Sequence, residues 1–174
     1  MREIQFINSI MDSEIWKSLL KVQRFIMFLT TVLMLVILGA VVLARYVLHA
    51  DLYGYDEIVL VDSFWMYFIG AAYAMSKEEH IKADILATMM GEKLLAVAKL
   101  AAGILQTSIN FIFVVLAYNM VARSIETWTV TSLWNIPYFI PQTAILLSFV
   151  ITALYLTVYT IRDYNHLVAL TRKG

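Results

Sequence analysis

The sequence predicts an all-α integral membrane protein with four transmembrane helices and both termini in the cytoplasm. Of its 174 residues 61% are hydrophobic and 15% charged, and the mean hydropathy is +0.77, which is too apolar for an ordinary soluble domain. Lysine and arginine number 4, 1, 4, 1 and 3 in the five stretches around four apolar runs, where the third stretch is counted up to the body of the third run and so includes Lys99. Because basic residues near span ends stay in the cytoplasm, this alternation predicts one membrane domain over residues 1–174 with both ends inside.

The first apolar run covers residues 25–44 and contains no charged residue. A helix of that length crosses the roughly 30 Å of hydrocarbon in a bilayer at about 1.5 Å per residue. The second run covers residues 58–75 and is interrupted by Asp62. We expect the chain to leave the cytoplasm in the first run and to return in the second.

The third predicted span covers residues 94–122, with Lys99 near its inner end and Asn110 near its middle. Asn110 is of the type that hydrogen-bonds between membrane helices. The fourth span covers residues 138–161 and is followed by a cytoplasmic tail at 162–174. Pro141 belongs near the first turn of that helix, where a missing N–H costs least.

Two further segments are amphipathic, and we expect them to lie as interfacial helices on the membrane lipids of the cytoplasmic face. In residues 1–23 the apolar positions recur at steps of three and four, at Ile4, Ile7, Met11, Ile15, Leu19 and Val22. The second segment, 78–92, would join spans two and three. The alternative for each segment is a simple helical extension of the span that follows it.

Asp62 is a functional candidate because an ionisable group inside a span costs at least a few kcal/mol. It lies roughly 7 Å below the outer surface at the helical rise of about 1.5 Å per residue. Water, Arg45 or Arg123 would be within reach from that surface. A structural or subunit-contact role and a proton or ion site are both open for this residue.

The residue content argues against catalysis and against cofactors or metals. There are no cysteines, which removes disulfides and thiolate chemistry. The three histidines, His49, His80 and His166, all fall outside the spans, so no pair of them can hold haem within the membrane. The formal net charge is zero, which gives no case for a nucleic-acid partner.

The densest polar motif follows the second span at Lys77-Glu78-Glu79-His80-Ile81-Lys82-Ala83-Asp84. His80 and Asp84 are four residues apart, so they share a face if this segment is helical. Lys77 and Glu79 add to a polar cluster at the membrane surface.

Together with four other features in the same order, this motif resembles the small membrane subunit of tripartite ATP-independent periplasmic (TRAP) transporters, the DctQ type. Those features are Arg45-Tyr46-Val47 at the end of the first span, the acidic pair Asp56-Glu57, Trp65, and Gly70-Ala71-Ala72. Asp62 is not part of the family pattern, so the resemblance gives it no role.

The resemblance implies a non-catalytic subunit in the bacterial inner membrane. Its partners would be a large multi-span TRAP membrane subunit, which moves as an elevator and holds the substrate and sodium sites, and a periplasmic substrate-binding protein. The substrate would be an organic acid such as a sialic acid or a C4-dicarboxylate. The small subunit would brace the stationary scaffold and contribute to docking of the periplasmic protein.

The resemblance also suggests roles for individual residues. Arg45, Asp56 and Glu57 would form or border a polar cluster on the outer face, and the loops 51–57 and 123–135, with Arg123, would face the periplasmic partner. The cytoplasmic elbow between spans two and three would be ordered by Lys77, Glu79, His80 and Asp84.

The main alternative is an autonomous small oligomeric channel or proton-coupled carrier in which Asp62 titrates. It predicts transport by this chain alone. A membrane enzyme or redox subunit is a third class, and the absence of cysteines and of histidines within the predicted spans disfavours it.

Overall fold

The structure is a computed structural model that describes residues 13–77 and 91–171. These residues form four helices, α2 (Glu14–Tyr46), α3 (Tyr55–Ser76), α5 (Glu92–Thr127) and α6 (Phe139–Thr171). All four are long and apolar enough to cross a membrane. The prediction of an all-helical protein with four such segments is therefore confirmed.

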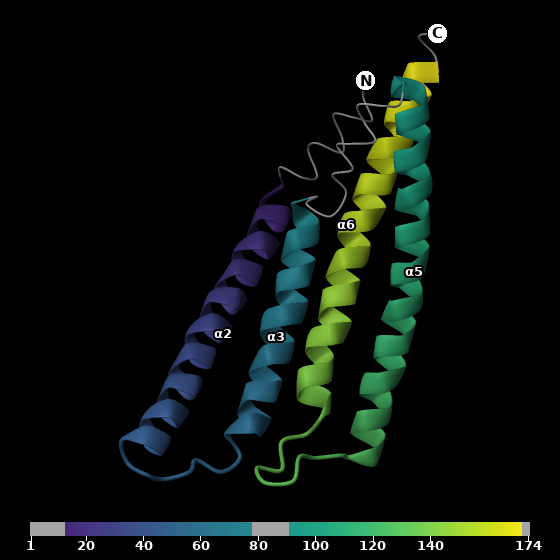
Figure 1. Cartoon of the computed structure of the whole chain (residues 1–174). Coiled ribbons are helices and arrows are strands. Elements are labelled where there is room, and N and C mark those ends of the chain that lie inside the picture. Colours follow the sequence, from purple (N-terminus) through teal and green to yellow (C-terminus); the bar gives the residue numbers. More distant parts are fainter. Residues whose placement is uncertain (1–12, 78–90, 172–174) are drawn as a thin grey trace.

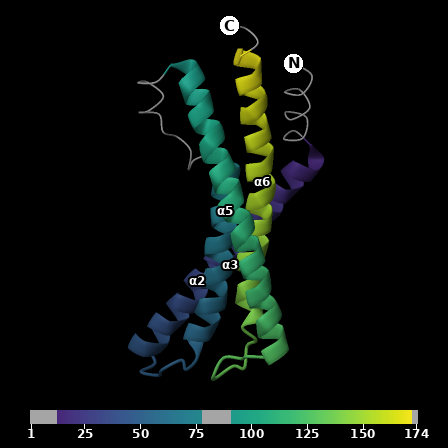
Figure 2. The same cartoon turned by 90° about the vertical axis from the view of Figure 1, so that its right-hand side faces the viewer.

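The four helices stand in a row in the order α2, α3, α6, α5, because α2 contacts α3, α3 contacts α6 and α6 contacts α5 (Figure 1). Turned by 90°, the same helices are seen to be inclined to one another (Figure 2). Among the described residues, the backbone of α2 lies beside that of α3 alone, and the backbone of α5 beside that of α6 alone. Their remaining surface carries exposed apolar side chains such as Leu35 and Leu105, as a lipid or a partner helix requires.

Three of the helices are much longer than a bilayer core. The 22 residues of α3 span roughly 33 Å, whereas the 33 to 36 residues of the others span roughly 50 Å at about 1.5 Å per residue. The excess of α5 and α6 extends past α3 at the end where α2 begins and α6 terminates (Figure 1). Each predicted span therefore lies in a helix that is longer than the apolar run. The exception is the start of α6, which begins at Phe139 instead of residue 138.

The predicted interfacial segments are described only in part. Residues 14–23 are continuous with α2, which begins after the cap Ser13, whose hydroxyl accepts a hydrogen bond from the Trp16 N–H at 3.3 Å. This part therefore matches the alternative of an extended span. Residues 1–12 and 78–90 lie outside the described residues. An interfacial position for them, and the cytoplasmic side of this end, stay predictions.

Small residues let the backbones approach one another. Ala72 of α3 and Ala144 of α6 are completely buried. A Cβ atom added to Gly103 of α5 would lie 3.0 Å from the Thr160 hydroxyl oxygen of α6. That hydroxyl is 3.1 Å from the hydroxyl of Thr107, one helical turn further along α5. Close backbones with small residues at the contact are typical of helices that associate in lipid.

Hydrogen bonds between helices reinforce this packing. The Ser148 hydroxyl on α6 donates to the Phe68 carbonyl on α3 at 2.7 Å. The Asn110 amide nitrogen on α5 donates to the Phe149 carbonyl on α6 at 3.0 Å, which confirms its expected role. Such bonds contribute about 0.6 kcal/mol each on average in a membrane. Together they fix the register of α6 against both of its neighbours.

Candidate functional site

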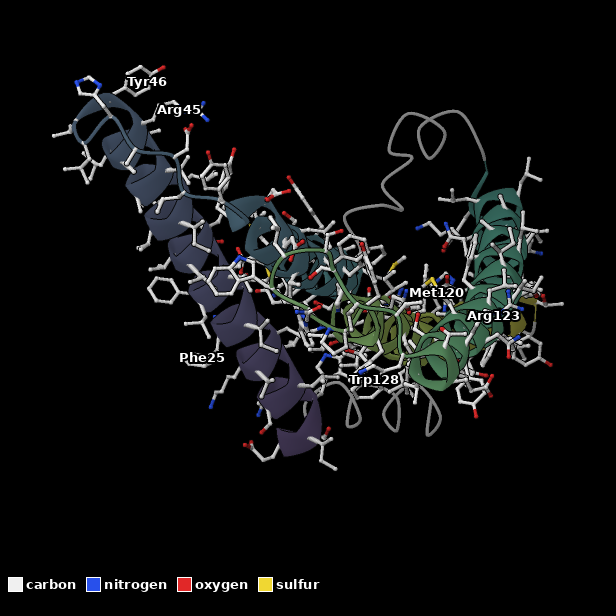
Figure 3. All side chains as sticks on the ribbon, turned by 90° about the horizontal axis from the view of Figure 1, so that it is seen from below. Phe25, Arg45, Tyr46, Met120, Arg123 and Trp128 are labelled. Atoms are coloured by element: carbon white, nitrogen blue, oxygen red, sulfur yellow. The ribbon has the colours of Figure 1, made fainter. Side chains whose placement is uncertain are left out.

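Two connecting loops, 47–54 and 128–138, lie at one end of the row (Figure 1). Figure 3 views this end directly and shows Arg45 on the α2 side and Trp128 on the α5 side, well separated. The family resemblance assigns parts of both loops to the periplasmic partner. Their geometry is therefore where a docking function would be found.

The loop between α5 and α6 is a compact hairpin, which we call the 129–138 hairpin. The Thr131 N–H donates to the Ile136 carbonyl, and the Tyr138 N–H donates to the Thr129 carbonyl, both at 3.0 Å. The Thr131 hydroxyl also accepts the Ile136 N–H at 2.9 Å. Asn135 adopts a positive φ of 53°, which asparagine tolerates better than most residues. The hairpin therefore has its own internal hydrogen bonds.

Glu57, in the first turn of α3, holds the tip of this hairpin. One carboxylate oxygen accepts the Leu133 N–H at 2.8 Å, and the other accepts the Trp134 N–H at 2.9 Å. The Trp134 ring lies against Gly54, where an added Cβ would collide with the indole nitrogen. Hydrogen bonds to a charged acceptor are the stronger kind, so a single side chain fastens the α5–α6 loop onto α3.

The other two members of the predicted outer polar cluster lie nearby along the chain. Arg45 forms an ion pair with Asp51, with its Nε 3.5 Å from a carboxylate oxygen, and both side chains are more than half exposed. Asp56, next to Glu57, is exposed. The structure thus brings Glu57 to the hairpin and Arg45 to the α2–α3 loop. Their action as one cluster stays a prediction.

The remaining predicted residues are spread over the molecule. Arg123 is exposed on α5, and Figure 3 places it far from Arg45. Lys77 follows the last turn of α3 with its ammonium 5.7 Å from the centre of the Tyr73 ring. Three further members of the predicted elbow lie outside the described residues, and their role stays a prediction: Glu79, His80 and Asp84.

Asp62 is buried inside the row, with 3% of its surface exposed. Within the described part of the chain, neither carboxylate oxygen has a hydrogen-bond partner. Arg45 was expected to be within reach of Asp62, but its side chain pairs with Asp51 instead. Burying an unpaired charge costs several kcal/mol, so an ionised Asp62 would destabilise the folded chain.

At the opposite end of the row, a side-chain contact that the sequence did not predict joins α6 to α2. The Tyr155 hydroxyl of α6 donates to the Gln23 side-chain oxygen of α2 at 2.9 Å, and the Trp16 ring lies 4.6 Å from the Tyr155 ring. Gln23 and Thr30 lie seven residues apart on one face of α2, and both are buried. Two polar residues on one face of an apolar helix could have indicated from the sequence that this face of α2 packs against another helix.

These contacts can hold positions, and they offer no arrangement for bond-making chemistry. Within residues 13–77 and 91–171, no three His, Cys, Asp or Glu side chains lie close enough together to hold a metal ion. What the described residues supply is a set of fastenings between helices and a rigid loop at one end.

Comparison with known families decides the class of protein. The family described as tripartite ATP-independent periplasmic transporters, DctQ component, matches residues 33–166. The chain belongs to the DctQ family. The matched range includes Glu57, Asp62 and the 129–138 hairpin, together with all of α3 and α5. No curated protein matches the chain.

Membership in this family makes the chain a multi-pass membrane component of a transporter and not an enzyme. The resemblance read from the sequence motifs is thereby confirmed. A tripartite transporter has two further components. By family these are the large membrane component and a periplasmic binding protein, so the DctQ component works as one part of three.

Proposed function

We propose that this DctQ component braces the large elevator subunit by fixing its stationary scaffold. The observation that carries the proposal is the way the helix row is fastened. Glu57 ties the hairpin to α3 at one end, Ser148 ties α6 to α3 in the middle, and Tyr155 ties α6 to α2 at the other end. An elevator needs an immobile frame, and a row joined at three levels resists shear.

The shape of the row supports the same role. A single layer of helices presents two broad faces, and α2 and α5 carry exposed apolar side chains along much of their length. A layer of this kind enlarges a scaffold without enclosing a substrate path. Helices longer than the bilayer core, with polar ends, also resist vertical movement in the membrane.

The proposal includes docking of the periplasmic binding protein at the 129–138 hairpin. Trp128, Leu133 and Trp134 are all more than half exposed at this end. Aromatic residues are enriched at protein interfaces, and a loop already held by Glu57 loses little freedom when it binds. The alternation of basic residues predicts that this end faces the periplasm and that the two chain termini face the cytoplasm.

We propose that the substrate is bound by the partner subunits and not by this chain. The family resemblance implies sodium symport of an organic acid, of the sialic acid or C4-dicarboxylate class, at a site on the large subunit. We propose that the DctQ component contacts neither the substrate nor the sodium ion. Ser148, Asn110 and Tyr155 support this because their side-chain hydrogen bonds are made between helices.

The test is purification from native bacterial membranes in mild detergent, followed by reconstitution. We expect a large multi-span protein to be recovered in a fixed ratio with the tagged chain. In proteoliposomes, uptake with the periplasmic binding protein should require both membrane components. Recovery of this chain alone and self-associated, or full uptake by the large component without it, would contradict the brace.

A second candidate function is an autonomous channel or proton-coupled carrier, and the burial of Asp62 without a hydrogen-bond partner is the observation that favours it. It predicts proton-coupled transport in vesicles that contain only this chain, lost in Asp62→Asn. The brace predicts no transport in those vesicles with either sequence. The two functions are thus separated by one flux measurement.

A further inference from the structure

A cavity of about 320 Å³ opens between the first turns of α5 and the last turns of α6. Its wall on α5 includes Glu92 and Lys99, seven residues apart on one face of the helix. Its wall on α6 is made by Arg162, Asp163 and His166. Charged groups of both signs therefore converge on one space, at the lower end of the size range of small-molecule sites.

The depth of the cavity follows from the neighbouring helix. α3 ends at Ser76, whose carbonyl accepts a hydrogen bond from the Tyr159 hydroxyl of α6 at 2.8 Å. Arg162 comes three residues later, roughly 5 Å further along α6 at about 1.5 Å per residue. Since the length of α3 matches the hydrocarbon core, we expect the cavity to lie at the level where lipid headgroups begin.

The α6 wall of the cavity is fixed by its own contacts. An Arg162 guanidinium nitrogen lies 3.5 Å from an Asp163 carboxylate oxygen, and the guanidinium lies 5.1 Å from the centre of the Tyr159 ring. Both charged side chains are less than one third exposed. On the α5 wall, Lys99 and Glu92 are exposed. The cavity thus combines a preset charged pair with two adaptable charges.

We propose that this cavity binds the headgroup of an amino-phospholipid, in which a phosphate and a primary ammonium are joined. The phosphate would accept hydrogen bonds from Lys99 and from the N–H groups of Arg162 and His166, while the ammonium would donate to Glu92 and Asp163. A headgroup with only negative charge would meet two carboxylates. A quaternary ammonium has no N–H to donate. The mixed lining therefore favours the zwitterion with a primary amine.

The position of the cavity favours a headgroup that belongs to a membrane lipid over the same headgroup free in solution. Leu95 on the same wall supplies an apolar surface beside the charges, where the first part of an acyl chain would lie. Pockets with basic residues between membrane helices at the headgroup level are established lipid sites in general. This inference depends on the membrane location of the chain and not on the brace or on its periplasmic partner.

The experiment is native mass spectrometry of the complex as purified, stripped of loosely bound lipid and titrated with phosphatidylethanolamine, phosphatidylglycerol or phosphatidylcholine. Lys99→Gln and Glu92→Gln each remove one charge from the cavity. Lys93→Gln is the matched control, because Lys93 is an exposed neighbour of Glu92 that does not line the cavity. Glycerophosphoethanolamine, the soluble headgroup, is the competitor that tests the source.

We expect phosphatidylethanolamine to bind about 5-fold or more tightly than the other two lipids, and each cavity variant to remove most of that preference. Lys93→Gln should bind as the unmodified chain does. Equal binding of the three lipids, or binding unchanged in both cavity variants, would overturn the proposal. Competition by the soluble headgroup at concentrations equal to the lipid would overturn the assignment to a lipid. Melting temperatures of the three variants establish that each is folded.

Discussion

Tyr155 on α6 and Gln23 on α2 are joined by a 2.9 Å hydrogen bond, although α3 stands beside α2 in the helix row and α6 does not. Both side chains are almost completely buried, with exposed fractions of 0% and 1%. The Gln23 amide nitrogen has no hydrogen-bond partner among the described residues. The Tyr155 hydroxyl therefore supplies the hydrogen bond that this buried amide receives.

Replacing Tyr155 with phenylalanine should destabilise the folded chain by about 1–2 kcal/mol, because it leaves the Gln23 oxygen buried without a donor. Thermal unfolding in detergent measures the loss. Adding Gln23→Leu to the same chain should recover most of it, since an apolar pair leaves no polar atom unpaired. Tyr164→Phe, at an exposed position of the same helix, is the control and should be neutral. Equal stability of Tyr155→Phe and the control would show that the tie contributes nothing.

Replacing Glu57 with glutamine removes one of the two oxygens that hold the hairpin tip. We expect the Leu133 and Trp134 amide protons to exchange with solvent faster, and the periplasmic binding protein to be recovered less well with the membrane complex. Asp56→Asn is the matched control for the exchange measurement, since Asp56 is the exposed neighbour of Glu57. Unchanged exchange would mean that the hairpin is held by its internal bonds alone. Faster exchange with undiminished recovery would remove the hairpin from the docking surface.

Replacing Gly54 with alanine tests the contact between the α2–α3 loop and the hairpin. Gly54 has a φ of 78°, a left-handed conformation that costs a residue with a Cβ about 1–2 kcal/mol, and the new methyl group would also displace Trp134. The melting temperature should fall. Gly39→Ala should not lower it, because no atom of the described residues lies within 4 Å of a Cβ added at Gly39 and alanine is the better helix former inside α2. A pair of variants with the same melting temperature would contradict this account of the loop.

Replacing Asp62 with asparagine separates structure from transport. The amide keeps the shape of the side chain and cannot carry a charge, so we expect the chain to be at least as stable as before. Uptake by the complete transporter should continue at its original rate. A variant that folds and assembles but no longer supports uptake would give Asp62 the role of the carrier hypothesis.

The sequence predicted the spans well because an apolar run of about 20 residues is rarely anything other than a membrane-spanning helix. It could not predict how far α5 and α6 continue, since polar residues such as Arg162 and Asp163 extend a helix readily beyond the lipid. The row order was also out of reach. Apolar side chains such as Leu35 suit lipid and helix neighbours equally, so hydropathy does not say which helices touch.

The sequence predicted one side of the contact at the candidate site and not the other. The acidic pair drew attention to Glu57, but its partners are the backbone N–H groups of Leu133 and Trp134, which every residue except proline carries and no pattern reveals. Among the described residues, Asp62 is buried without an arginine partner because the Arg45 side chain points toward Asp51. Only the folded loop determines that direction.

The order of the row has a consequence for how the protein is made. Chains emerge from the ribosome beginning at the N-terminus, so α5 enters the membrane before the only helix it contacts in the described structure has been synthesised. The nascent protein is then one helical hairpin, α2 with α3, and one solitary helix beside it. α6 is synthesised last and must enter between α3 and α5, so the polar groups that await it, among them Asn110, stay unpaired until translation is nearly complete.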